Sequence, residues 1–331
     1  MAIVGNTYLT LADLYKQKDP NGNIADVIEL LAESNPILDD MIVVEANDGT
    51  THLTTMRTGI PSATFRRLYQ AVQPKKSTTK QVRDATGMME NWSEIDAKLV
   101  DLSGNPGKLR LNEATAFIEG LSQTAGRRLF YGNTATDPEE FLGFAPRFGV
   151  KSAENGAQII DAGGTGSDNA SIWFVVWGER TVHALYPKGS KAGISRDDKG
   201  KQTKDVDGGV YDVYREKFSW DLGLSVRDWR YVTRIANIDV SEMQAGNVKL
   251  YDFMRKAYYR LRQRRVTGGR AAIYANTDVL EALDALATNA GASDSFIRLR
   301  PMEIEGKEVL SYRGIPIRET DALLNTEARV V

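Results

Sequence analysis

The sequence reads NEATAFIEGLSQTAGRRLFYG from Asn112 to Gly132, and this is the clearest helical segment of the chain. Apolar residues recur in it every three or four positions, the spacing of one face of an α-helix. These residues are Ala114, Phe117, Ile118, Leu121, Ala125 and Leu129. Asn112 has a side chain suited to an N-cap, and Gly132 stands where helices commonly end. The pattern predicts a long helix over 112–131.

Upstream of this helix, residues 41–84 have the character of a long β-hairpin that lacks a core of its own. Ile42-Val43-Val44 is strand-like, Asn47-Asp48-Gly49 is a strong turn signal, and strand character returns over 66–72. Residues 52–57 are rich in threonine and present no apolar face. Because a lone two-stranded ribbon is marginally stable in water, we expect this hairpin to lie on another surface.

The other segments mix helices and strands, which predicts an α+β protein. Helices are expected within 1–40 (including 24–31), at 91–101, at 248–265, and after Thr277 as a cap. Strands are expected at 172–177, 181–186, 210–218, 220–226, 271–275, 308–312 and 315–319. Two polar, glycine-containing stretches are expected to be loops, at 151–170 and, with high mobility, at 188–209.

Composition restricts the class of protein. A chain of 331 residues favours two domains and can bury a core without a staple. Lys and Arg number 42 and Asp and Glu 44, so the net charge of −2 argues against a dedicated nucleic-acid binder. The absence of cysteine excludes disulfides and thiolate metal sites. The start carries no signal-peptide pattern and no apolar run approaches the ~20 residues of a membrane span, so we expect a soluble protein without a membrane partner.

Catalytic motifs are weak. His52 and His183 are the two histidines of the chain, and because no Gly-x-Ser-x-Gly elbow accompanies them we interpret both as structural. Gly163-Gly164-Thr165-Gly166 lacks the Gly-Lys-Ser/Thr ending of a phosphate-binding loop. Asp205-Val206-Asp207-Gly208 is an incomplete calcium loop and is better explained as a turn. We therefore expect no enzyme, cofactor or metal, with a nucleotide-using enzyme built on the 163–166 loop as the alternative.

The helix predicted over 248–265 carries a basic face. Its members are Arg255, Arg260, Arg262 and Arg265. Tyrosines are interleaved with these arginines, as in surfaces that stack nucleic-acid bases. A solvated or salt-bridged helix face has the same composition, and the balanced net charge favours that interpretation. Both interpretations stay open at this point.

Four stretches in this order resemble the major capsid proteins of tailed bacteriophages, which have the Hong Kong 97-like fold. The first is the 114–132 helix followed by NTATDPEEFLGF (133–144), and the second is WDLGLSVRDWR (220–230) with RIANI (234–238). The third is AIYAN (272–276), and the fourth is YRGIPIRETDAL (312–323). The sequence looks most like capsid proteins of podoviruses, such as those of Bordetella phages.

The resemblance implies a division of the chain into discontinuous parts. They are an N-terminal arm with short helices (1–40), an extended β-hairpin loop (41–84), a peripheral part with a spine helix at 112–131 (85–150), an axial part (151–209), peripheral strands with the basic helix (210–270), and an axial part with closing strands (271–331).

The same resemblance implies a structural function: self-assembly, through hexamers and pentamers in the host cytoplasm, into the icosahedral head shell of the virion around the phage genome. The implied partners are other copies of the chain, a scaffolding protein, a cement or decoration protein, and packaged double-stranded DNA held by non-specific charge. An arm and a ribbon that cannot bury themselves must pack on neighbouring copies in head-to-tail contacts. We expect Arg57, Arg66 and Arg67 to pair there with acidic residues of adjacent subunits. Another oligomeric phage protein, a connector or tail component, is the alternative.

Overall fold

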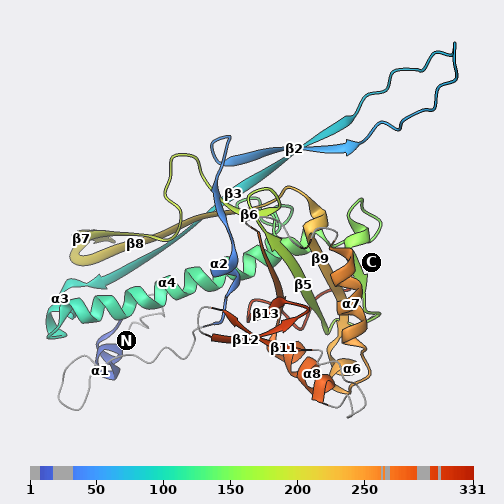
Figure 1. Cartoon of the computed structure of the whole chain (residues 1–331). Coiled ribbons are helices and arrows are strands. Elements are labelled where there is room, and N and C mark those ends of the chain that lie inside the picture. Colours follow the sequence, from blue (N-terminus) through green and yellow to red (C-terminus); the bar gives the residue numbers. More distant parts are fainter. Residues whose placement is uncertain (1–7, 18–32, 262–263, 265–268, 289–298, 305–306) are drawn as a thin grey trace.

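A computed structural model of the chain shows an α+β protein from which two hairpins project (Figure 1). It describes residues 8–17, 33–261, 264, 269–288, 299–304 and 307–331. The helices are α1 (Leu11–Lys16), α2 (Ile37–Asp40), α3 (Ala97–Leu102), α4 (Pro106–Tyr131), α5 (Phe144–Arg147), α6 (Val240–Gln244), α7 (Leu250–Arg260) and α8 (Thr277–Thr288). The strands are β1 (Val43–Glu45), β2 (Thr51–Gly59), β3 (Thr78–Asp96), β4 (Ile159–Asp161), β5 (Asn169–Trp177), β6 (Val182–Tyr186), β7 (Ser195–Val206), β8 (Gly209–Val226), β9 (Val232–Asp239), β10 (Arg270–Ala275), β11 (Arg300–Ile304), β12 (Lys307–Tyr312) and β13 (Ile315–Glu319).

The strands join into one mixed sheet, with the path β11-β12-β13-β10-β5-β6-β8-β3-β2. Every residue of β5 is buried, and β5 pairs with β9, β10 and β6. Aromatic side chains from α4, α5 and β10 close around it, with Phe130, Phe144 and Tyr274 inside the main core. The strands predicted at 172–177, 181–186, 271–275, 308–312 and 315–319 are confirmed. The helix expected at 24–31 lies outside the described residues.

The long helix α4 ends at Tyr131 as predicted but begins six residues before the predicted start. Its N-cap is Asn105, whose side chain accepts a hydrogen bond from the Lys108 backbone amide at 3.1 Å. Pro106 follows at the first helical position, where its missing N–H costs nothing. Asn112, the predicted cap, lies inside the helix. α4 packs against β3 and β8.

Gly132 follows α4 as predicted, but its backbone is not left-handed, since φ is −51°. The requirement for glycine is close packing. A Cβ at Gly132 would lie 2.5 Å from the Phe141 carbonyl oxygen, and a Cβ at Gly143 would lie 2.7 Å from the Arg128 carbonyl oxygen. The Gly143 amide donates to the Gly132 carbonyl at 2.8 Å. These two glycines fold the 132–143 loop back onto the end of the helix.

Strand was missed in two segments for the same reason, which is pairing between distant segments. Of the helix expected at 91–101, the second half is confirmed as α3, but β3 continues to Asp96 because Thr86–Asp96 pairs with Gly223–Val213 of β8. The mobile loop expected at 188–209 is largely β7, paired along its length with β8. The strands expected at 210–218 and 220–226 are one strand.

In the C-terminal half, the end of α7 and the capping residue of α8 differ from the predictions. α7 spans Leu250–Arg260, and residues 262–263 and 265 of the predicted helix lie outside the described part of the chain. α8 begins at Thr277, but its capping side chain is Asn276, which accepts a hydrogen bond from the Val279 amide at 3.0 Å. The Thr277 hydroxyl instead donates to Glu319 at 2.7 Å.

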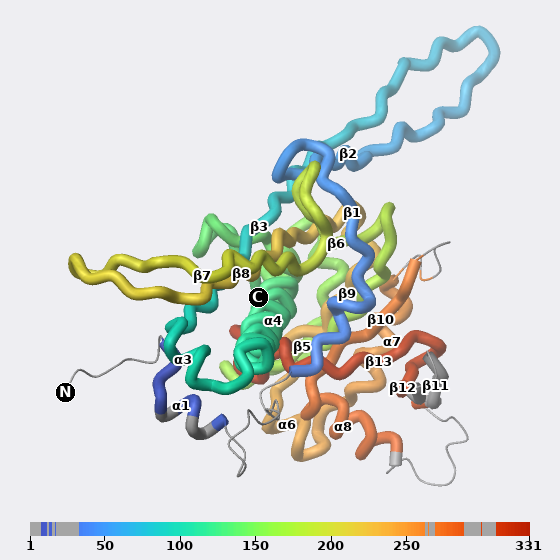
Figure 2. Tube along the Cα trace, turned by 90° about the vertical axis from the view of Figure 1, so that its left-hand side faces the viewer, coloured from blue at the N-terminus to red at the C-terminus, as the bar shows by residue number. Residues whose placement is uncertain are grey.

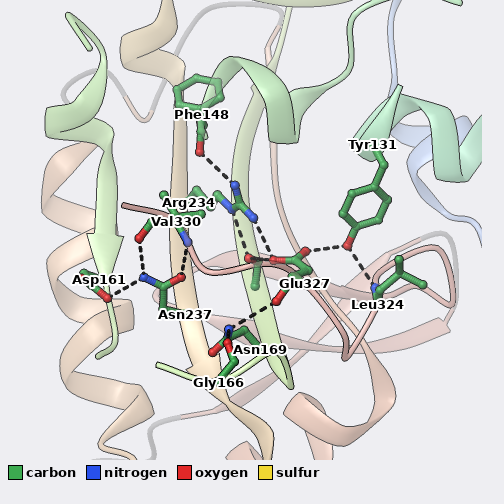
Figure 3. A network of polar contacts seen from close by, with 11 residues as sticks. Tyr131, Phe148, Asp161, Gly166, Asn169, Arg234, Asn237, Leu324, Glu327 and Val330 are labelled. Carbon is green, nitrogen blue, oxygen red and sulfur yellow. Dashed lines mark hydrogen bonds and ion pairs between the residues drawn. The ribbon is translucent and has the colours of Figure 1, made fainter. Parts of the chain in front are cut away.

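The C-terminal segment is fixed to the body by a buried polar network (Figure 3). Arg234 donates to Glu327 at 2.8 Å and to the Phe148 carbonyl at 2.9 Å, and both ion-pair side chains are 4% exposed. The Tyr131 hydroxyl, at the end of α4, donates to the other oxygen of Glu327 at 2.5 Å. Burial together with Glu327 raises the pKa of Tyr131 far above its usual value. Asn237 completes the network by exchanging two hydrogen bonds with the Val330 backbone.

We expect Gly143→Ala to lower the free energy of unfolding by about 1–3 kcal/mol, because its Cβ has no space beside the Arg128 carbonyl. Gly120→Ala is the matched control, since Gly120 is an exposed α4 residue and, apart from the backbone of its own helix turns and its chain neighbours, nothing lies within 4 Å of the place its Cβ would take. That change should stabilise the protein by up to about 1 kcal/mol through helix propensity. Urea unfolding of both variants measures the difference; equal effects would contradict the close-packing explanation.

We expect Glu327→Gln to destabilise the chain by about 3–5 kcal/mol, because it leaves the buried guanidinium of Arg234 without a counter-charge. The control is Asp252→Asn, which breaks an ion pair with Arg255 in which both side chains are about half exposed. Exposed pairs contribute at most about 1 kcal/mol, so the control should change stability little. Thermal unfolding monitored by circular dichroism compares the two, and a similar loss in both would refute the assignment.

Candidate assembly surface

A hairpin of β2 and β3 projects far from the body (Figure 1). The two strands pair from Thr51 opposite Ala85 to Gly59 opposite Thr78, with a bulge between Arg57 and Gly59. Figure 2, turned by 90°, also shows the hairpin clear of the body. β1 does not belong to this hairpin, although its residues were expected in it, because it pairs in parallel with β6. We call β2, the loop that follows it and β3 as far as Arg83 (residues 51–83) the arm.

The loop of the arm, residues 60–77, contains no strand, so the strand character expected at 66–72 is absent. Among the described residues, its large apolar side chains find no surface to pack on. Phe65 and Tyr69 are fully exposed, and Ile60 and Leu68 are 86% and 84% exposed. Lys75 ties the two sides of the loop together by donating to Ser62 and Thr64. Apolar groups gathered on such a projection mark a surface that binds a partner.

The charge of the arm has a single sign. Between Gly49 and Arg83 the sequence has seven basic residues and no acidic one. They are Arg57, Arg66, Arg67, Lys75, Lys76, Lys80 and Arg83. With a net charge of −2 for the whole chain, the remainder carries −9. The structure places Arg57 on β2 and Arg66 and Arg67 in the exposed loop, all in this one projection.

The root of the arm is a polar joint. Backbone pairing between β3 and β8 stops at Thr86 and Gly223. Beyond that point Asp84 of β3, which is 4% exposed, accepts a hydrogen bond from the Ser225 hydroxyl and pairs with Arg147, both at 2.8 Å. Arg147 also donates to the Leu224 carbonyl. Where the backbone ladder between β3 and β8 ends, side-chain contacts therefore continue to attach β3 to the body.

Both histidines of the chain lie at this joint, although 131 positions separate them. The rings of His52 on β2 and His183 on β6 meet edge to face, with centroids 5.3 Å apart. Burial lowers the pKa of His183 to about 4, and His52 and Arg227 act in the same direction. Burial also lowers the pKa of His52, again with help from Arg227, while Asp84 opposes the shift. Sequence reasoning treated both histidines as structural and had no signal for their contact.

The second projection, the hairpin of β7 and β8, turns at Asp207 and Gly208, both with left-handed backbones (φ 54° and 80°). This confirms the turn predicted there. Ion pairs, and not an apolar face, stabilise this hairpin. Arg215 pairs with Glu94 of β3 at 2.5 Å and Arg196 with Glu216 at 2.7 Å. Such a polar stretch resembles a loop in the sequence, which explains why this hairpin was missed.

Only part of the basic face predicted on α7 lies within the described residues. Arg255 pairs with Asp252 at 2.9 Å, and Arg260 donates to the Ala157 carbonyl at 2.7 Å. Arg262 and Arg265 lie outside the described residues.

A guanidinium–tyrosine cluster lies at the end of α7. Arg264 lies 4.4 Å from the ring centre of Tyr258, and Arg313 lies 5.2 Å from the same ring. Arg313 also donates to the Tyr259 hydroxyl at 3.1 Å. No ion pair of either arginine is found within the described part of the chain. This cluster was not in the predicted set, because Arg313 is far from α7 in the sequence.

The motifs of the enzyme alternative do not form a site. The 163–166 loop leads into the buried strand β5, whereas a phosphate-binding loop leads into a helix whose N-terminus binds the anion. Gly164 packs against the Asn237 carbonyl of β9, so the loop lies against the sheet. Across the described ranges, no group of His, Cys, Asp and Glu is arranged to bind a metal ion. No helix there is long and apolar enough to cross a membrane.

Comparison with known proteins gives a consistent result. The family described as major capsid protein GP7 matches residues 19–331. A chain in the structure of bacteriophage Epsilon15 is 37% identical, with a TM-score of 0.77 over 100% of this chain and 99% of that one. The capsid of bacteriophage JBD30 aligns with a TM-score of 0.54 at 9% identity, over 89% of this chain and 92% of that one, which shows the fold alone. A search of curated proteins found no match.

The family match covers nearly the whole chain, and the Epsilon15 likeness covers all of it. The α+β class, the Hong Kong 97-like fold and the structural function expected from the sequence are confirmed by these matches. A polypeptide with an uncovered, cationic arm and a body of opposite charge has the properties that a self-assembling subunit needs. The chain belongs to the GP7 family of phage major capsid proteins.

Proposed function

We propose that the arm is the element through which each copy of this capsid protein binds the next copy in the shell. The observation that carries the proposal is the exposure of Phe65, Leu68 and Tyr69 on a projection that contains only basic charges. Burial of an aromatic side chain stabilises an interface by roughly 1.5–3 kcal/mol. The loop that carries these side chains stands clear of the described body of its own subunit (Figure 2).

The partner surface for the arm is a second copy of the chain. Residues outside 49–83 carry a net charge of −9 against +7 on the arm, so each copy offers both members of a complementary pair. The arm of one copy and the acidic acceptor surface of the next copy would make a head-to-tail contact. Contacts of this kind close into rings. Arg57, Arg66 and Arg67 would pair there with acidic residues of the neighbour. Complementary charge of this kind steers association and sets the register of the contact.

Rings of five and six copies together would form a closed icosahedral head shell. The same arm must then reach its acceptor at more than one angle, which requires a joint at its root. Further partners follow as proposals: a scaffolding protein during assembly in the host cytoplasm, a cement or decoration protein on the outside, and double-stranded DNA inside. Electron microscopy separates this function from a connector, which would form rings, or a tail component, which would form tubes.

We expect the triple reversal Arg57→Glu, Arg66→Glu and Arg67→Glu to abolish shells while leaving folded, soluble subunits. The reversal replaces attraction with repulsion at the acceptor, and the three residues make no intramolecular ion pair among the described residues. Negative-stain microscopy and size-exclusion chromatography measure the outcome. Circular dichroism checks that the subunit is folded.

The control for this variant reverses three exposed cations elsewhere: Lys98→Glu on α3, Lys191→Glu between β6 and β7, and Lys249→Glu before α7. It makes the same change in net charge away from the arm, so its shells should form. Normal particles from the arm variant would refute the proposal. Failure of both variants would assign the defect to overall charge.

We also propose that the basic surface at the end of α7 contacts the packaged DNA. Its exposed cations are Arg255, Lys256, Arg260 and Arg313. Arg264 joins them over the tyrosines, and a guanidinium stacked on an aromatic ring keeps N–H groups free for a phosphate. Among these, Arg255 is the one with a carboxylate partner within the described part of the chain.

For this surface we expect the variant Arg260→Ala, Arg264→Ala, Arg313→Ala to bind DNA more weakly than the wild-type subunit. Each phosphate contact adds about 0.9 to the slope of log K against log salt, so the slope should fall by about 2–3. Fluorescence anisotropy with a labelled duplex of about 20 base pairs over a salt series measures the slope. The control is Lys188→Ala with Lys191→Ala; an equal fall there would contradict a specific surface.

A further inference from the structure

We propose that His52 and His183 form a proton-operated release at the root of the arm, so that protonation of the pair detaches the arm from the body. The inference concerns regulation of the assembly surface and therefore takes its biological meaning from the proposed function. The release itself is a property of one subunit and can be tested without shells.

The geometry of the pair carries the argument. The His52 and His183 rings lie edge to face at 5.3 Å, and the two residues are 7% and 0% exposed. His52 Nδ1 and both ring nitrogens of His183 are buried and make no well-formed hydrogen bond within the described part of the chain, although the Gly178 backbone lies beside His183. Two neutral imidazole rings can be buried in this contact without placing a charge in the interior. Two imidazolium rings would place like charges in contact without water.

The groups around the pair come from every element that packs there. β3 supplies Asp84, whose carboxylate is already engaged by Arg147 and by the Ser225 hydroxyl of β8. The segment after β8 supplies Arg227, whose charge disfavours protonation of both rings. Asp84 acts in the other direction on both. Burial and Arg227 outweigh it, because the net shift of each ring is toward the neutral form.

The position of the pair explains why its charge would move the arm. His52 lies on β2, opposite Asp84 of β3, so it belongs to the arm. His183 lies on β6, opposite Ser225 of β8, so it belongs to the body. The backbone ladder between arm and body ends at Thr86, and at this level the joint is made of side chains. Repulsion between the rings therefore acts where the β3–β8 ladder has ended, and on the β2 side it is opposed by the Asp48–Thr51 bridge and by two hydrogen bonds between the Asn47 side chain and the Leu53 backbone.

The direction of the pH dependence follows from the lowered pKa values. A released His183 would titrate near 6.5, whereas the packed ring titrates near 4. The packed root is thus fully favoured above pH 6.5 and loses stability as the pH falls from 6.5 toward 4. From His183 alone, the ratio of attached to released root should fall about 20-fold between pH 7 and pH 5. His52 acts in the same direction.

Hydrogen–deuterium exchange of the full-length unassembled subunit at pH 7, 6 and 5 tests the release. A detached two-stranded ribbon is marginal in water, so release should also open the β2–β3 ladder. After correction for the chemical exchange rate, protection in 51–57 and 80–86 should fall by up to about 20-fold, while peptides from α4 and β5 stay protected. The His52→Gln, His183→Gln chain contains no histidine, so its root should lose this pH dependence. Unchanged wild-type protection, or the same fall in the histidine-free chain, would overturn the proposal.

Two further measurements keep the test decisive if the double variant does not fold. Ser225→Ala removes the bond to Asp84 without touching a titrating ring, so it should lower root protection equally at all pH values. NMR titration of the two wild-type imidazoles should place the His183 midpoint near 4 and the His52 midpoint below its ordinary value, and midpoints at the ordinary value of both rings would overturn the proposal. Because these readouts use the subunit alone, loss of shells in the arm variant and failure of the release are distinguishable.

Discussion

The antiparallel pairing of β3 with β8 holds both projections of the molecule on its body. Thr86–Asp96 and Val213–Gly223 form one continuous ladder, and α4 packs against both strands. Beyond one end of this ladder β3 continues into the arm, and beyond the other end β8 continues into the second hairpin. Two projections that lack a core are thus held by strands whose other halves belong to the body. This solves the problem that an isolated ribbon is marginal in water.

The two projections are stabilised in different ways, which suggests different tasks. The β7–β8 hairpin satisfies its charges within the subunit, through pairs such as Arg215 with Glu94 and Lys201 with Asp212. The arm has no acidic residue between Gly49 and Arg83 and leaves Phe65 and Tyr69 bare. A hairpin whose charges are paired within its own subunit needs no partner. The exposed apolar and basic side chains of the arm, by contrast, can be buried and paired only by another molecule. For a member of a major capsid protein family, another copy of the chain is the natural partner.

The joint at the root of the arm contains both a stabilising ion pair and a pair of rings that protonation would destabilise. Asp84 is held by Arg147 and Ser225, which resists detachment at neutral pH. Beside it, His52 and His183 contribute apolar packing only while both rings are neutral. The same few residues therefore fix the arm and make its attachment sensitive to protons. Elsewhere the body uses buried charge differently: Arg234 and Glu327 are fully paired, and together they fix the C-terminal segment.

Local patterns in the chain were sufficient to predict the long helix to Tyr131, the buried strand β5, the turn at Asp207 and Gly208, and an uncovered ribbon before the helix. Each depends on neighbours along the chain: apolar spacing, turn residues, or the lack of an apolar face. The contact of His52 with His183, the extension of β3 to Asp96 and the packing of Gly143 under the Arg128 carbonyl arise only in the folded molecule. The same holds for the contact of Arg313 with Tyr258 and Tyr259. These contacts join segments brought together by the order of strands in the sheet, and no local pattern encodes that order. The family resemblance supplied the fold class, but the residues that form the joint became visible only when the strands were in place.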